Sequence, residues 1–106
     1  MNKEAAVELC KRALACKHWR WIIGCVNEVG ECYAGDHLFY LGTYPDIFQP
    51  ATLGCLVVLV QEAYGDKVVI SQGNGWWSVE TDHYRWDDDN TTSFQEALVK
   101  TLEAAK

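Results

Sequence analysis

The residues with the greatest potential for chemistry in this chain of 106 residues are its five cysteines and three histidines. The cysteines are Cys10, Cys16, Cys25, Cys32 and Cys55, and the histidines are His18, His37 and His83. A structural zinc site usually contains cysteine pairs a few residues apart, and no C-x-x-C pair occurs here. We therefore predict no metal site and no cofactor, with the cysteines acting as reduced, mostly buried apolar residues.

Thiol catalysis would require a cysteine with a lowered pKa and a histidine beside it. Cys32 is the best candidate, because Asp36-His37 follows it in a polar stretch. Asp82 and His83 are neighbours on an expected strand, so their side chains point to opposite faces and do not form a dyad. The chain lacks the glycine-rich phosphate-binding motifs and the G-x-S-x-G motif of hydrolases. We predict that the protein is not an enzyme, and a cysteine or histidine enzyme stays as an alternative.

Five tryptophans in so short a chain are more informative, because tryptophan is enriched where proteins bind partners. The segment 76–86, WWSVETDHYRW, is expected to form one strand whose side chains alternate between two faces. One face would carry Trp76, Glu80, Asp82, Tyr84 and Trp86. We predict that this face is the binding surface, with rings as anchors and carboxylates that steer a basic partner. The alternative is that the rings simply cover the sheet.

The charge balance is acidic, with 9 basic and 15 acidic residues and a formal net charge of −6. Nucleic-acid binding requires a basic surface, so direct contact with DNA or RNA is disfavoured and a partner protein with a basic surface is favoured. No apolar run is long enough for a membrane span, and the N-terminus lacks the apolar core of a signal peptide. We expect a cytoplasmic protein that binds no membrane, and a homodimer stays open.

A helix at about residues 50–64 is expected to be the centre of the fold. Its sequence contains the longest apolar run in the chain, from Leu53 to Val60 with Gly54 as the one interruption. Pro50 suits a first helical turn, and Gly65 suits the position just after a helix end. We predict that this helix is buried on its wide apolar face.

The other elements complete an α+β fold in one domain, residues 1–106. A helix is expected at 3–17, a strand at 18–26, one or two short strands within 31–42, a strand at 67–71, a turn at Gly73-Asn74-Gly75, and a last helix opened by Ser93 and Glu96. With segment 76–86 as a strand, the order is α-β-β-α-β-β-α. Short strands separated by turns favour a small, mostly antiparallel sheet with helices packed against it.

Three stretches of the chain resemble small proteins of unassigned function that tailed bacteriophages and prophages encode. They are ALACKHWRW with the following IIGC, PATLGCLVVLVQEAYGD, and the closing EALVKTLEAAK. The resemblance covers most of the chain and implies a phage origin and a host cytoplasm, but it transfers no active site. We expect an accessory protein that binds and inhibits or modulates a host protein, with defence systems among the candidate targets. The alternatives are a protein that binds or sequesters a nucleotide signal, and the cysteine or histidine enzyme.

Overall fold

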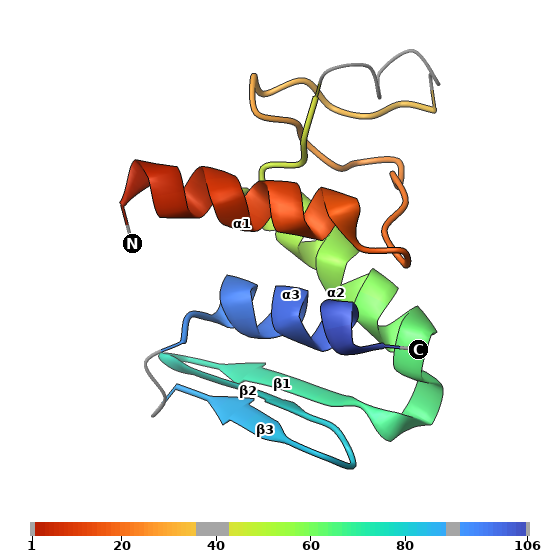
Figure 1. The fold of residues 1–106 in the computed structure, drawn as a ribbon, viewed down its shortest axis with the longest axis vertical. Coiled ribbons are helices and arrows are strands. Elements are labelled where there is room, and N and C mark those ends of the chain that lie inside the picture. The colour runs from red at the N-terminus through yellow and green to blue at the C-terminus, as the bar shows by residue number, and fades with distance from the viewer. Residues whose placement is uncertain (1, 36–42, 89–91, 106) are drawn as a thin grey trace.

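The computed structural model describes residues 2–35, 43–88 and 92–105, and in these residues helices and an antiparallel sheet form separate layers (Figure 1). The elements are α1 (Lys3–Ala15), α2 (Pro50–Tyr64), a 3₁₀ turn η2 (Gly65–Lys67), β1 (Val69–Gly73), β2 (Trp76–Glu80), β3 (Arg85–Asp87) and α3 (Phe94–Ala104). Helix α3 lies on the sheet, and α1 and α2 pack on α3 from the other side. The predicted α+β class with an antiparallel sheet is confirmed.

Helix α2 matches the predicted central helix in both position and burial. Pro50 is its first residue, and Gly65 follows its end with a φ of 64°, a conformation that favours glycine. Leu56, Leu59 and Val60 are almost completely buried in the main core. The opposite side of the helix, with Gly54 and Val58, faces solvent, as the helical period predicts.

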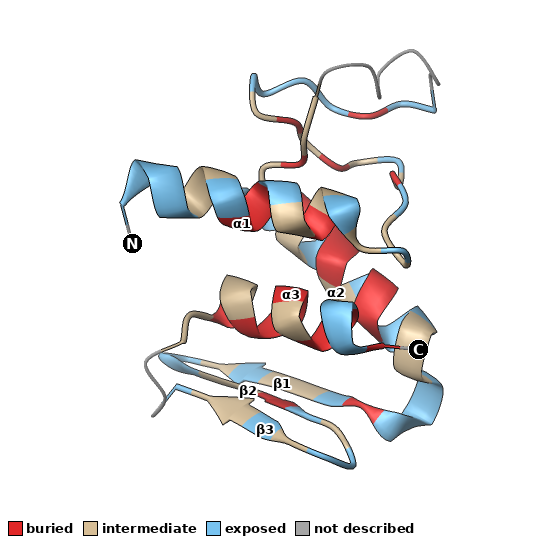
Figure 2. Ribbon diagram, in the orientation of Figure 1, coloured by how far each residue is buried: buried red, intermediate tan, exposed pale blue. Residues whose placement is uncertain are grey.

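Helix α3 is the central layer of the fold, between the sheet on one side and helices α1 and α2 on the other. The Ser93 side chain accepts a hydrogen bond from the backbone N–H of Glu96, as predicted for the start of this helix. Six of its residues are buried because the sheet covers one side and the other helices cover the other (Figure 2). They are Phe94, Ala97, Leu98, Val99, Thr101 and Leu102.

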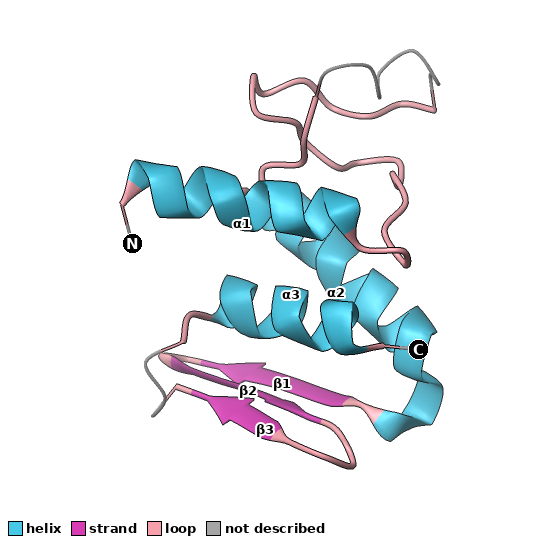
Figure 3. Ribbon diagram, viewed as in Figure 1, coloured by secondary structure: helices cyan, strands magenta, loops and turns pink. Residues whose placement is uncertain are grey.

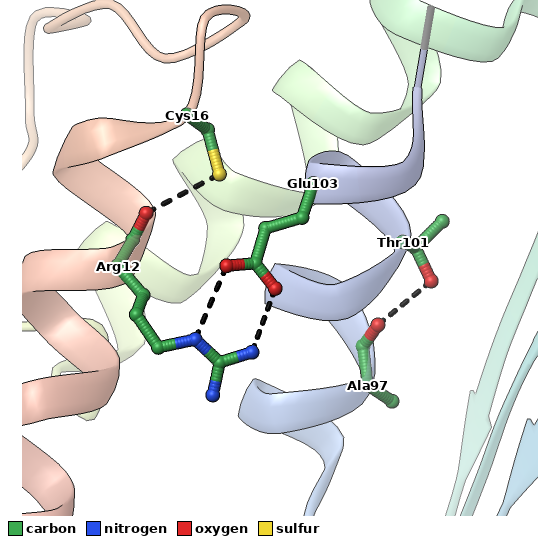
Figure 4. A network of polar contacts seen from close by, with 5 residues as sticks. All are labelled: Arg12, Cys16, Ala97, Thr101 and Glu103. Atoms are coloured by element: carbon green, nitrogen blue, oxygen red, sulfur yellow. Dashed lines mark hydrogen bonds and ion pairs between the residues drawn. The ribbon is translucent and has the colours of Figure 1, made fainter.

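Helix α1 is capped by the Asn2 side chain and joined to α3 by an ion pair. Two hydrogen bonds of 2.6 and 3.1 Å link the Arg12 guanidinium to the Glu103 carboxylate (Figure 4). Both side chains are partly exposed, so the pair adds only modestly to stability. Its main effect is to fix how the last turns of α1 and α3 lie against each other.

The described residues between α1 and α2, 16–35 and 43–49, form loops, so the predicted strand at 18–26 is wrong (Figure 3). Within these ranges the strand pairing is limited to isolated bridges, from Val26 to Cys32 and from Asn27 to Pro45. The backbone of Val26 instead bonds to a side chain of α2: Thr52 Oγ1 accepts from its N–H at 2.8 Å and donates to its carbonyl at 3.1 Å. Residues 31–35 form no strand beyond the Cys32 bridge, and residues 36–42 of the second predicted strand lie outside the described residues.

The sheet has the order β1-β2-β3, and its two faces differ in chemistry. The first hairpin pairs Gly73 with Trp76 across the predicted turn, where Gly75 has a φ of 80°. Trp77 and Val79 point toward α3, since Val79 is fully buried and the Trp77 ring lies 5.5 Å from that of Phe94. The alternate residues form the outer sheet face, which no helix covers within the described residues. These residues are Val69, Ser71, Gly73, Trp76, Ser78, Glu80, Arg85 and Asp87.

Candidate functional site

The five predicted site residues do not share one face, because segment 76–86 is a hairpin and not a single strand. Strand β2 ends at Glu80, and residues 81–84 turn the chain into β3. Across this turn, Val79 is opposite Trp86 and Glu80 is opposite Arg85. Trp86 therefore lies on the inner face with Val79, while Trp76 and Glu80 lie on the outer face.

The Thr81 side chain stabilises the turn that the sequence prediction missed. Its hydroxyl oxygen accepts hydrogen bonds from the backbone N–H groups of His83 and Tyr84, each at 3.3 Å. The N–H of Thr81 also donates to the carbonyl of Tyr84 at 2.9 Å. Two signals could have revealed the turn: a strand of eleven residues is about twice the usual length, and Thr-Asp is a favourable turn pair.

Trp86 and Tyr84 belong to the interior side of the sheet. Trp86 packs against the main core, and the Lys100 ammonium of α3 lies 4.9 Å from its ring centroid. The Tyr84 ring meets the Trp86 ring edge to face at 6.1 Å. Their prediction as exposed anchors on the face of Trp76 is wrong, because the turn moves them to the other side of the sheet.

Trp76 is the exposed aromatic residue of the outer sheet face, with 47% of its surface accessible. Its indole lies over the α-carbon of Gly73 on the neighbouring strand, where a Cβ atom would be only 2.1 Å from the indole nitrogen. At the other end of the hairpin, Val69 is 57% exposed and lies opposite Glu80. Ser71 and Ser78 are paired between these two ends, and because serine side chains are small, the middle of the face is a shallow depression.

Carboxylates outnumber cations over the outer sheet face and its adjoining turns. Glu80 and Asp82 are exposed at the β2–β3 turn, half-buried Asp87 pairs with Ser78, and exposed Asp88 donates its N–H to the carbonyl of Trp77. The cations are Lys67, which lies near Asp82, and Arg85, whose Nε lies 3.6 Å from the Asp87 carboxylate. The side chain of Arg85 is 62% exposed, so solvent weakens this pair, and the four carboxylates leave the face as a whole acidic.

A pocket of about 440 Å³ opens beside Tyr84 and Asp82. The Tyr64 hydroxyl at its wall donates to the Thr101 carbonyl at 2.7 Å and lies 3.1 Å from the Tyr84 hydroxyl. Burial, together with the hydrogen bond to Tyr84, raises the pKa of Tyr64 well above its usual value. The phenol therefore stays protonated. This pocket joins residues from α2, η2, the β2–β3 turn and the end of α3, and it was not predicted from the sequence.

Burial opposes ionisation of two of the described cysteine thiols. Burial raises the pKa of Cys25 to about 12 and that of Cys16 to about 11, which opposes nucleophilic chemistry at both residues. Cys32 is exposed, while Asp36 and His37, its predicted neighbours, lie outside the described residues. Within the described ranges, no three histidine, cysteine or acidic side chains gather closely enough to hold a metal ion.

Comparisons of the chain with protein-family models, with curated proteins and with solved structures find no match. The resemblance to phage proteins therefore stays a prediction. Among the helices that the structure describes, none has the length and apolar character needed to cross a membrane.

Proposed function

We propose that this protein binds a partner protein through its outer sheet face and the adjoining acidic turn. The main support is Trp76, the largest of the exposed apolar side chains in the described part of the chain. Large aromatic side chains at the open surface of a small domain are typical anchors of protein interfaces. Trp76, Glu80 and Asp82 remain proposed binding residues, whereas Tyr84 and Trp86 pack with the core side.

The shape and charge of the face indicate the kind of partner. The stretch from Trp76 to Glu80 measures about 13 Å, at roughly 3.3 Å per strand residue, with small serines between its ends. An extended segment of about four residues covers this length. Its apolar end would contact Trp76, and its basic end would lie near Glu80 and Asp82, whose charges steer association. In line with the phage resemblance, we take the partner to be a bacterial host protein that is inhibited or modulated in the host cytoplasm.

A small-molecule binder, such as a protein that sequesters a nucleotide signal, is the second candidate function. The pocket beside Tyr84 favours it, because its volume of about 440 Å³ lies within the range of ligand sites. The side chains that line the pocket include one carboxylate, Asp82, and one ammonium group, Lys67, so they offer no excess of positive charge to a phosphate. We therefore place this candidate after protein binding.

Capture from a bacterial lysate tests the proposal when charge-altered variants are compared. In the test variant, Ser78→Arg and Glu80→Lys add positive charge to the outer sheet face. The matched control, Glu8→Lys with Ala51→Arg, makes the same change in charge at exposed positions of α1 and α2. We expect the control and the unmodified protein to capture the same basic host protein, and the test variant to lose it.

Two further observations should accompany that loss. Both variants should keep the unfolding midpoint of the unmodified protein within a few degrees, because Glu8, Ala51 and Glu80 are exposed and Ser78 is partly exposed on the outer sheet face. Captured protein should also dissociate as salt is raised, since exposed charges are screened. A partner that the test variant still captures, or an acidic partner that salt does not release, would rule out this surface.

A further inference from the structure

The pocket beside Tyr84 lies where two helices end and a hairpin turns. Figure 1 shows the C-terminal ends of α2 and α3 at the same end of the molecule as the β2–β3 turn. Ala63 of α2 and Ala104 of α3 line the pocket together with Asp82 and Tyr84 of the turn. The alanine methyl groups occupy little of the space, and the pocket volume of about 440 Å³ can hold a long side chain.

The electrostatics of the pocket favour a cation. Each helix C-terminus carries roughly half a negative charge, and neither α2 nor α3 has a basic residue in its last turn. Asp82 adds a full negative charge. Lys67 and His83 also line the pocket and oppose this charge. With His83 neutral, the two helix ends and Asp82 leave a net charge of about −1 after Lys67 is counted.

The hydrogen bonds leave acceptors free to meet such a cation. A phenol has one proton, and that of Tyr64 goes to the Thr101 carbonyl. The Tyr84 hydroxyl must therefore donate in its 3.1 Å contact with Tyr64. This leaves lone pairs on the Tyr84 oxygen, beside the exposed Asp82 carboxylate. The pocket offers acceptors and a negative field, so it suits a group rich in N–H donors.

We propose that this pocket accepts an arginine side chain of the partner protein. A guanidinium is planar, carries five N–H donors, binds a carboxylate with two parallel hydrogen bonds and stacks on aromatic rings. Asp82 and Tyr84 supply the carboxylate and the ring. The inference rests on the proposed function: the pocket opens on the helix side of the β2–β3 turn, so a basic segment that continues from the outer sheet face past Glu80 and over Asp82 can place one arginine in it.

Peptide titration followed by NMR tests the pocket directly. The probe is a blocked pentapeptide with a central arginine, and its control carries citrulline, which keeps the shape and loses the charge. The methyl signals of Ala63 and Ala104 report on the pocket. We expect the arginine peptide to shift both signals with at least about tenfold higher affinity than the citrulline peptide. Equal affinity for the two peptides would refute a charge-selective pocket.

Three variants at exposed positions test how the charge of the pocket affects the affinity for the arginine peptide. Asp82→Asn should weaken the arginine peptide about tenfold, and Lys67→Ala should strengthen it because a competing cation is removed. Asp88→Asn, a matched loss of charge outside the pocket, should leave the affinity unchanged. If inorganic phosphate shifts the two methyl signals and Lys67→Ala abolishes that shift, the pocket is an anion site and the proposal is wrong.

The source of the guanidinium is tested with blocked arginine amide. If the single amino acid binds as tightly as the pentapeptide, the site takes a small molecule and not a partner side chain, which overturns the proposal.

Failure of the proposed function gives a different result from failure of this inference. In that case the arginine peptide would still bind the pocket, but no lysate protein would depend on Ser78 and Glu80. Conversely, a lysate partner that needs Glu80 while the arginine peptide leaves the pocket signals unmoved would overturn only the inference about the pocket.

Discussion

At the scale of single residues, Thr52 shows how one side chain can replace a strand partner. It is completely buried on α2, and its hydroxyl both accepts from and donates to the backbone of Val26. A buried backbone group without a hydrogen bond costs free energy, so the loop needs this contact to pack against the helix. Asn27 extends the same pattern, because its side chain accepts from the N–H groups of Val29 and Glu31.

The substitution Thr52→Val should lower the free energy of unfolding by about 1–3 kcal/mol, since it leaves the N–H of Val26 without its partner, while the Val26 carbonyl still accepts from the N–H of Asp46. Thr52→Ser keeps the hydroxyl and removes one methyl group, so it should cost only about 1 kcal/mol. Urea denaturation of the two variants measures the difference. If Thr52→Val is as stable as Thr52→Ser, the hydroxyl does not hold the loop.

At the scale of elements, the first hairpin combines a structural and a proposed binding role in Trp76. The indole covers Gly73, which has no side chain to pack, and leaves nearly half of its own surface exposed. Cross-strand pairs of this kind contribute to sheet stability, and a ring above a glycine replaces the missing packing. The position of the ring is therefore set by the strand pairing before any partner arrives.

Gly73→Ala should displace the Trp76 ring, because the new Cβ would lie 2.1 Å from the indole nitrogen. We expect the Trp76 indole N–H signal to move in NMR spectra and the free energy of unfolding to fall by about 0.5–1 kcal/mol. Gly54→Ala is the matched control, since nothing lies within 4 Å of a Cβ at that exposed helical position. It should stabilise α2 by up to about 1 kcal/mol and leave all indole signals in place. An unmoved Trp76 signal in Gly73→Ala would contradict the packing described here.

At the scale of the whole molecule, buried ionisable groups link stability to pH. Burial is the main cause that raises the pKa of Cys10 and Tyr64, and it raises that of Cys25 to about 12. Below about pH 9, folded and unfolded chains both keep the Cys25 proton. Between about pH 9 and pH 12, the unfolded chain releases that proton while the folded chain retains it, so the stability falls as the pH rises.

Removal of the Cys25 thiol should therefore reduce the alkaline loss of stability. From about pH 8 to about pH 10.5, the loss in Cys25→Ala should be smaller than in the unmodified protein by about 1–2 kcal/mol, since each pKa unit corresponds to about 1.4 kcal/mol. Cys32→Ala, at an exposed cysteine, should show the full loss. Denaturant melts at both pH values give the comparison. Equal alkaline losses in Cys25→Ala and Cys32→Ala would show that the buried thiol does not control this transition.

The sequence by itself determined the features that depend on neighbours within one or two turns of chain. Ser93 caps its helix as predicted, Pro50 and Gly65 bound the central helix, and the turn at Asn74 and Gly75 connects two strands. These signals act through backbone conformation and hydrogen bonds a few residues apart, so no knowledge of the rest of the fold is needed to interpret them.

Only the tertiary structure decided which face each aromatic residue takes and where the pocket forms. Trp86 is an inner residue because β3 pairs with β2 and places it opposite Val79, whereas an alternating pattern read straight through residues 81–84 gives the opposite side. Val26 is held by Thr52, 26 residues away, and the pocket joins the ends of α2 and α3 to the β2–β3 turn. Such contacts depend on the packing of segments far apart in sequence, which local propensity does not encode.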